Sequence, residues 1–121
     1  MNDEIRLVSE ATQTIYKSSS GLEVMLVRVG TDLLMTTKEI AKLYGVARST
    51  AIRHLLKLFA TGKLNKKLVS SILTHKAGDG KLYRTTFYNT TAVIAVGLSL
   101  KTPEAAAFQR WLGVKSVKRI K

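Results

Sequence analysis

Two stretches of the chain alternate apolar and polar positions with the period of two that is typical of β-strands. Residues 22–29 and 33–35 are dense in β-forming side chains and are separated by a Gly-Thr-Asp sequence. Residues 73–76 and 82–88 flank a loop whose Asp-Gly pair favours a tight turn with positive φ. The pattern therefore predicts two β-hairpins.

Between and after these hairpins, the apolar positions follow the helical period. Thr36 followed by Glu39 fits a capping box, which places the start of the first helix at residue 37. Thr102, Pro103 and Glu104 are residue types that start a helix, and Asn89 or Thr90 can cap another. The predicted helices cover residues 37–43, 47 or 48 to 59 or 60, 65–72, a segment around 92–96, and 105 to about 117.

The order of these elements predicts the fold class and the domain organisation. We expect an α+β fold: a helix-turn-helix, winged-helix-like core with β-hairpins before and after it and helices at its C-terminus. Residues 1–21 are expected to form a flexible N-terminal segment, and residues 22–121 one domain with a C-terminal helix and a basic tail. A chain of 121 residues that is 45% hydrophobic is long and apolar enough for one packed domain.

Residues 37–56 have the spacing of a helix-turn-helix. Two short helices that meet at a steep angle need a small residue at their contact, a residue that tolerates positive φ in the turn, and an apolar residue after it. Ala41, Gly45 and Val46 supply these in that order. The apolar face of the second helix contains Ala51, Leu55 and Leu58, widened by Ile52, Leu56 and Phe59, and the opposite face contains Ser49, Arg53 and Lys57.

Charge is segregated along the sequence. The chain has 20 Lys and Arg against 8 Asp and Glu, a formal net charge of +12. Residues 40–78 and 105–121 are rich in Lys and Arg and contain no acidic residue. Such segregation makes a positive face, which favours a polyanionic partner through phosphate contacts and counterion release. A solvated surface that only keeps the protein soluble is the alternative.

Missing residue types and motifs exclude several function classes. With no cysteine, the chain has no disulfide, thiolate zinc site, iron–sulfur cluster or cysteine nucleophile, and two histidines are too few for an all-histidine metal site. No phosphate-cradling glycine loop and no nucleophile motif is present. The N-terminus is polar and acidic, and no 18-residue apolar run occurs. We expect a cytoplasmic protein that is not an enzyme, with no cofactor, metal, small-molecule ligand or membrane association.

The candidate DNA-contacting residues lie on the first two predicted helices and on the second hairpin. Arg48 and Arg53 fit bidentate contacts to guanine edges, and Ser49 fits a base or phosphate contact. Lys57 fits a phosphate contact, and Thr37 and Lys38 lie at a helix start, where backbone phosphates are held. The hairpin is either a wing that lays Lys76, Lys81 and Arg84 along DNA or an ordinary connection. His54 is either a DNA contact or a half-buried packing residue.

Several short motifs together resemble one known family. These motifs are residues 34–50, Arg53-His54, Gly62-Lys63-Leu64, Gly80-Lys81-Leu82-Tyr83, Tyr88-Asn89 and Ile94-Ala95-Val96-Gly97. They resemble the N-terminal region of the RhuM virulence-protein family, over roughly residues 16–112. Residues 101–111 are similar to the end of the BRO-N domain of phage and viral antirepressors. The resemblance implies a DNA-binding protein carried by a phage or another mobile genetic element.

The sequence departs from the family pattern in the second helix. Ala47 stands where the family usually has a serine that caps this helix. Ile52 takes the place of a small polar residue, which puts it near DNA against a thymine methyl group. The complete predicted DNA-binding set is Thr37, Lys38, Arg48, Ser49, Thr50, Ile52, Arg53, His54, Lys57, Lys76, Lys81 and Arg84.

We therefore expect a sequence-specific double-stranded DNA-binding protein that regulates transcription. Because one recognition helix reads only a few base pairs, a homodimer on a pseudo-palindromic site is expected. The apolar face of the last helix (Ala107, Phe108, Trp111 and Leu112) is either its interface or packed within the monomer. The alternatives are an antirepressor-like protein-interaction module and a nonspecific or RNA-binding nucleic-acid protein.

Overall fold

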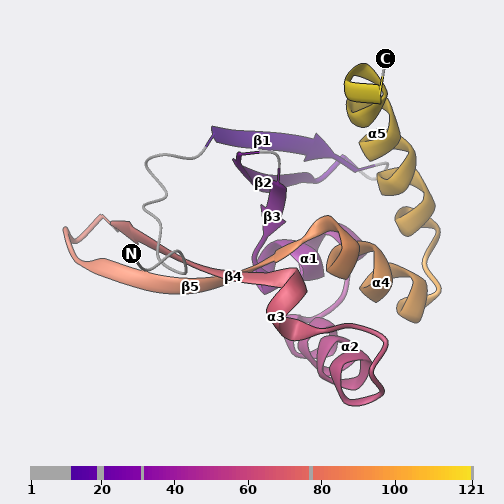
Figure 1. Cartoon of the computed structure of the whole chain (residues 1–121), viewed down its shortest axis with the longest axis horizontal. Coiled ribbons are helices and arrows are strands. Elements are labelled where there is room, and N and C mark those ends of the chain that lie inside the picture. Colours follow the sequence, from indigo (N-terminus) through magenta and orange to yellow (C-terminus); the bar gives the residue numbers. More distant parts are fainter. Residues whose placement is uncertain (1–11, 19–20, 31, 77, 121) are drawn as a thin grey trace.

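The computed structural model is an α+β structure in which helices lie beside a five-stranded antiparallel sheet (Figure 1). The structure describes residues 12–18, 21–30, 32–76 and 78–120, except for the side chains of residues 12, 75, 76 and 113–120. The strands are β1 (Thr12–Lys17), β2 (Glu23–Val29), β3 (Asp32–Met35), β4 (Ser70–Lys76) and β5 (Leu82–Asn89). The helices are α1 (Thr37–Tyr44), α2 (Arg48–Ala60), α3 (Lys66–Val69), α4 (Thr90–Leu100) and α5 (Pro103–Ile120).

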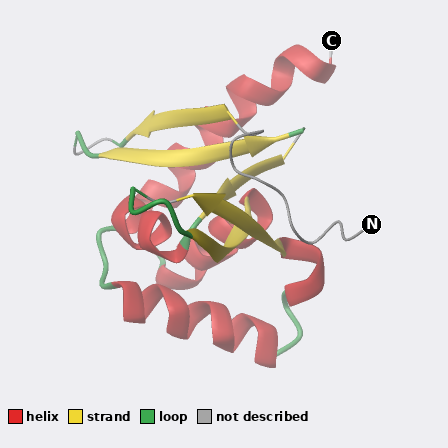
Figure 2. Cartoon of the chain, turned by 90° about the vertical axis from the view of Figure 1, so that its left-hand side faces the viewer, coloured by secondary structure: helices red, strands yellow, loops and turns green. Residues whose placement is uncertain are grey.

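The sheet has the strand order β1-β2-β3-β5-β4, with all neighbours antiparallel. Figure 2 draws the strands in yellow and the helices in red. Both predicted hairpins are confirmed: β2 pairs with β3, and β4 pairs with β5 along its whole length. Leu34 and Met35 of β3 pair with Asn89 and Tyr88 of β5, so the two hairpins belong to one sheet. The β4–β5 hairpin projects away from the helices (Figure 1).

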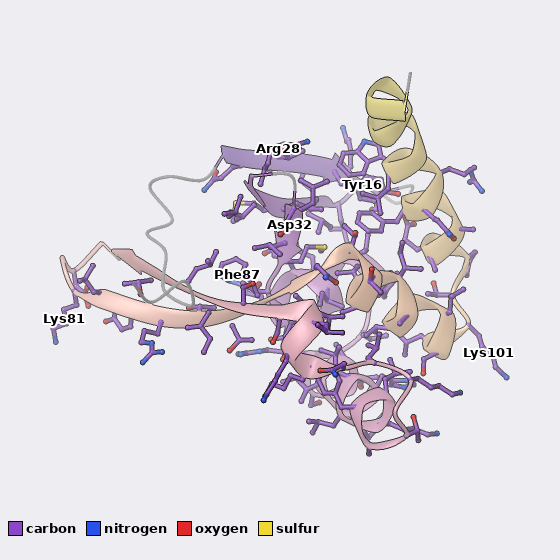
Figure 3. The ribbon with its side chains drawn as sticks, in the orientation of Figure 1. Tyr16, Arg28, Asp32, Lys81, Phe87 and Lys101 are labelled. Atoms are coloured by element: carbon purple, nitrogen blue, oxygen red, sulfur yellow. The ribbon has the colours of Figure 1, made fainter. Side chains whose placement is uncertain are left out.

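Strand β1 was not predicted, and for residues 12–17 the expectation of a flexible segment over 1–21 is wrong. This strand pairs with β2 from Thr12 opposite Arg28 to Lys17 opposite Glu23. Tyr16 is buried, because its ring packs against Phe108 and Trp111 of α5. Figure 3 shows Tyr16 on the side of the sheet next to this helix. The strand therefore forms because it pairs with β2 and because α5, which is distant in the sequence, packs against Tyr16. Residues 1–11 lie outside the described part of the chain.

The helix predicted over residues 65–72 is too long. Asn65 caps the helix by accepting a 3.0 Å hydrogen bond from the Lys67 N–H, but α3 ends at Val69. From Ser70 onward the backbone is strand β4, whose residues pair with β5. Leu68, an apolar residue of α3, is 76% exposed. Over residues 70–72, the hydrogen-bonded pairing with β5 therefore decides the backbone conformation, although the apolar residues there have helical spacing.

The first two helices agree closely with the prediction. Thr36 caps α1 by accepting a 3.3 Å hydrogen bond from the Glu39 N–H. Gly45 ends α1 with φ of 67°, a left-handed conformation that glycine adopts at little cost. The capping box is incomplete in its second half, because the Glu39 carboxylate accepts the N–H of Met25 in β2 at 2.8 Å. This bond ties the start of α1 to the sheet.

Most of the core lies between the helices and one face of the sheet. Ala51, Leu55 and Leu58 of α2 are buried there, as predicted, together with Phe108 of α5. A smaller cluster of Val27, Leu34, Leu73 and Phe87 packs β2 and β3 against the β4–β5 hairpin. In the part of the chain that the structure describes, no helix has the length and apolar character needed to cross a membrane.

The apolar face of α5 packs within the monomer. Phe108 is fully buried, and its ring lies 5.1 Å from that of Tyr16. Trp111 stacks on Phe108 and is also in contact with Tyr16. Tyr16 further donates a 2.6 Å hydrogen bond to Glu104, at the start of the same helix. Of the two fates expected for this apolar face, the structure shows packing in the core.

Candidate functional site

Helix α2 presents a polar row to solvent. Ser49, Arg53 and Lys57 are all exposed and lie four residues apart, so they share one face of the helix. The buried positions Ala51 and Leu55 fix the opposite face against the core. The orientation of the row therefore follows from the packing of α2. Leu56, predicted to widen the apolar stripe, is instead 59% exposed beside this row.

A solvent-open groove of about 760 Å³ adjoins the start of α2. Its lining comes from the start of α1, the first turns of α2, the sheet strands β1 and β2, and strand β5. Three of its lining side chains are cationic, one each from α1, α2 and β5: Lys38, Arg48 and Arg84. Met25, Val27, Ile52 and Phe87 contribute apolar surface to the same lining. We call this concavity the basic groove.

Arg48 is turned back toward α1. Its Nε donates a 2.9 Å hydrogen bond to the hydroxyl of Thr37, the first residue of α1. Ala47, the N-cap residue of α2, makes no side-chain capping bond. The contact between Thr37 and Arg48 therefore joins the starts of the two helices at the wall of the basic groove.

Glu39 is the only acidic side chain among the described residues that line the basic groove. Its carboxylate is held by the N–H of Met25, which directs it toward the edge of β2. With one carboxylate and three cationic side chains in its lining, the groove has a net positive charge. A groove of that sign attracts anionic groups.

The tip of the β4–β5 hairpin is organised by Asp79. Its two carboxylate oxygens accept hydrogen bonds from the Tyr83 hydroxyl at 2.7 Å and from the Lys81 N–H at 2.9 Å. The hydroxyl of Tyr83, and secondarily the Lys81 N–H, lower the pKa of Asp79. The same contact raises the pKa of Tyr83. The carboxylate of Asp79 is ionised at neutral pH and lies next to the exposed Lys81 at the end of the hairpin (Figure 3).

His54 packs between α2 and α4, while its predicted DNA contact stays a prediction. Its Nδ1 lies 2.7 Å from the Ser99 hydroxyl, a hydrogen bond that joins α2 to α4. The side chain is half-buried. The contact accounts for one of the two ring nitrogens of His54.

The predicted set falls into groups with different surroundings. The basic groove brings together Thr37, Lys38, Arg48, Ile52 and Arg84. The exposed row of α2 contains Ser49, Arg53 and Lys57, and half-buried Thr50 lies on a different side of the helix. Lys81 lies apart at the hairpin tip, and Lys76 lies in β4 opposite Leu82, with its side chain outside the described part.

Sequence reasoning missed part of the groove lining. Gln13, from the unexpected strand β1, lines the basic groove, as do Thr85 and Thr86 of β5. The period-two alternation of β5 was a usable signal for one of these threonines, since Arg84 and Thr86 share a face of the strand. Gln13 had no such signal, because its position depends on the pairing of β1 with β2.

Comparisons with known proteins add no assignment to this site. Neither protein-family models, nor curated proteins, nor solved structures give a match to the chain. The resemblance to the RhuM family thus stays a prediction from the residues. Among the described residues, no three His, Asp or Glu side chains are grouped so that they could hold a metal ion.

Proposed function

We propose that the protein binds double-stranded DNA through the exposed row of α2. In this proposal α1 and α2 act as a helix-turn-helix, and the β4–β5 hairpin acts as a wing. The observation that carries the proposal is that the exposed Ser49 and Arg53 each directly follow a residue of α2 that lines the basic groove, and that Lys57 continues their face of the helix. Polar side chains able to read bases thus lie next to cations able to hold phosphates.

The dimensions of α2 fit this role. Its 13 residues make a rod about 20 Å long. The major groove of B-DNA is about 12 Å wide and admits one helix. Because the opposite face of α2 is buried in the core, the helix can present its polar row without losing its packing. The formal net charge of +12 adds sequence-independent attraction to the backbone.

The position of the hairpin supports its role as a wing. Strand β3 directly precedes α1 and pairs with β5, so the hairpin and the two helices share one framework. The cluster around Leu34 and Phe87 holds the hairpin against the rest of the sheet. Arg84 lines the basic groove, and Lys81 is exposed at the tip. A wing built in this way would follow the phosphates next to the helix.

The biological setting follows from the sequence and is part of the same proposal. The RhuM-like motifs favour a cytoplasmic transcriptional regulator of a phage or mobile element, a binding protein and not an enzyme. A homodimer on two half-sites would supply useful specificity. Since Phe108 and Trp111 pack within the monomer, the dimer contact would use a different surface.

Selection from a random duplex pool tests the proposal directly. The full chain should enrich a short motif, or two copies of it at a fixed spacing. The enriched duplex should then bind more tightly than a shuffled duplex or a single-stranded RNA of equal length. A triple variant, Ser49→Ala with Arg53→Ala and Lys57→Ala, should lose this preference. Arg110→Ala, on exposed α5 surface, removes one positive charge elsewhere and should keep it.

Three results would count against the proposal. Equal affinity for the shuffled duplex would indicate a nonspecific binder, and tighter binding of RNA would indicate an RNA-binding protein. Unchanged affinity of the triple variant for the enriched duplex would show that α2 is not the reading helix. No binding of any nucleic acid at physiological salt would favour the antirepressor-like interaction module.

A further inference from the structure

The two arginines of α2 lie in different surroundings. Arg48 is at the first position of the helix, lines the basic groove, and donates its Nε to Thr37. Arg53 is exposed in the middle of the polar row, and among the described residues no hydrogen bond holds it. The sequence alone assigned both arginines the same role, because both are basic residues near the start of a recognition helix.

The hydrogen bond to Thr37 limits what Arg48 can do. A guanidinium presents five N–H donors in a rigid planar fork, and a base contact uses two of them side by side. The Nε edge of Arg48 is already occupied by the Thr37 hydroxyl. Its remaining nitrogens belong to a side chain that is anchored to α1 at the wall of the basic groove. Arg48 is therefore placed to contact a ligand that binds inside the groove.

The chemistry of the basic groove suits one strand of a nucleic-acid backbone. Lys38, Arg48 and Arg84 bring three positive charges to it from three separate elements. Phosphodiester oxygens pair with such side chains, and at least about half of all protein–DNA hydrogen bonds go to phosphate or sugar. The apolar side chains Met25 and Ile52 supply surface against which deoxyribose can pack. Charge and lining therefore both match a sugar–phosphate chain.

We propose that the basic groove holds the sugar–phosphate backbone of one DNA strand, so that Arg48 contacts phosphate while Arg53 reads base edges. This inference rests on the proposed function and assigns separate tasks within it. Thr37 is a positioning residue, since it holds the Arg48 guanidinium toward the groove. Affinity for any duplex would then depend on the groove, and sequence preference on the exposed row.

The test compares single variants of the full chain on two duplexes, the pool-selected one and a shuffled one, at several salt concentrations. Arg48→Ala should weaken binding to both duplexes by the same factor and lower the salt slope by about 1. Arg53→Ala should lower the ratio of the two affinities by roughly 5- to 150-fold. Arg110→Ala, a matched arginine that does not line the basic groove, should leave the ratio unchanged.

Two further variants separate positioning from charge. Thr37→Val keeps the size of the side chain but removes the hydroxyl that accepts the hydrogen bond from the Arg48 Nε. This variant should bind both duplexes more weakly by the same factor, and the salt slope should stay at the wild-type value. Arg48→Lys keeps the charge without an Nε, and should also keep that slope. Repeating the pool selection with Arg48→Ala should return the wild-type motif.

The outcomes distinguish this inference from the proposed function. If Arg48→Ala changes the selected motif or lowers the affinity ratio as Arg53→Ala is expected to do, Arg48 reads bases and the inference is wrong, while DNA binding by α2 stands. If Arg53→Ala leaves the ratio unchanged, the assignment of the base-reading residue is equally wrong. If the wild-type chain prefers no duplex sequence, both fail together.

Discussion

The ring of Tyr44 lies against the backbone of Gly97 so closely that a β-carbon at residue 97 would come within 2.6 Å of the ring. The same β-carbon would lie 2.7 Å from the β-carbon of Ala105. Gly97 is therefore the point at which α1, α4 and α5 meet. The hydroxyl of Tyr44 donates a 2.7 Å hydrogen bond to the Val93 carbonyl, one turn earlier in α4, and this bond leaves the ring little freedom to move away.

Gly97→Ala should therefore destabilise the protein, although alanine is the better helix former. Adding a methyl group to a closely packed site costs roughly 1–3 kcal/mol. Because atoms of Tyr44 and Ala105 would lie within 2.7 Å of the new β-carbon, the cost falls above the lower end of this range, and the gain in helix propensity of about 1 kcal/mol offsets only part of it. Urea unfolding followed by circular dichroism measures the difference. Leu98→Ala, at an exposed position of the same helix, should change the free energy of unfolding much less, and an equal loss in both variants would contradict the packing argument.

The raised pKa of Tyr44 predicts that the protein loses stability at high pH. Burial is the main cause that raises the pKa of Tyr44 above the ordinary tyrosine value of 10.0. Above pH 10 the unfolded chain releases the phenolic proton while the folded chain retains it, so stability falls as the pH rises. Tyr44→Phe removes this group. The stability advantage of the wild type over this variant should shrink by about 1.4 kcal/mol per pH unit above pH 10.

Unfolding curves of both proteins between pH 8 and pH 12 provide the measurement. Lysine titration affects both proteins equally, so it cancels in the comparison. A constant difference across this range would mean that Tyr44 titrates normally in the folded chain.

The elements that sequence reasoning found are those fixed by local signals. Thr36 and Gly45 mark the ends of α1, and the spacing of Ala51, Leu55 and Leu58 sets the orientation of α2. The exposed row of α2 follows from this orientation without any knowledge of the rest of the fold. Local capping and periodicity were sufficient for these features because neighbouring residues determine them.

The features that sequence reasoning missed depend on residues far apart in the chain. Strand β1 is stabilised by β2 and by α5, and Gln13 reaches the basic groove only through that pairing. The anchoring of Arg48 by Thr37 depends on how α1 and α2 meet. The Glu39 carboxylate binds Met25 because the end of β2 lies beside α1. None of these contacts has a periodic signal in the sequence.

Helix α2 offers a route to higher stability. Its N-cap residue, Ala47, has the extended backbone conformation of a cap (φ −66°, ψ 149°) but no side chain that can accept a hydrogen bond. Ala47→Ser supplies an acceptor for a free N–H of the first turn and should stabilise the protein by about 0.5–2 kcal/mol. Thermal unfolding measures the gain. Ala106→Ser, at an exposed position inside α5, introduces the same side chain without a capping site and should give no gain.

The tip of the β4–β5 hairpin gives a prediction for DNA affinity. Asp79 is ionised at neutral pH like an ordinary aspartate, the Tyr83 hydroxyl and the Lys81 N–H lower its pKa further, and its charge lies beside Lys81. Asp79→Asn keeps an oxygen that can accept the Lys81 N–H and removes the negative charge. If the hairpin is a wing, affinity for every duplex should rise about two- to fivefold at low salt, and less at high salt. The preference for the selected duplex should stay the same. Fluorescence anisotropy at two salt concentrations provides the measurement, and an affinity equal to that of the wild type at low salt would show that the hairpin tip does not approach DNA.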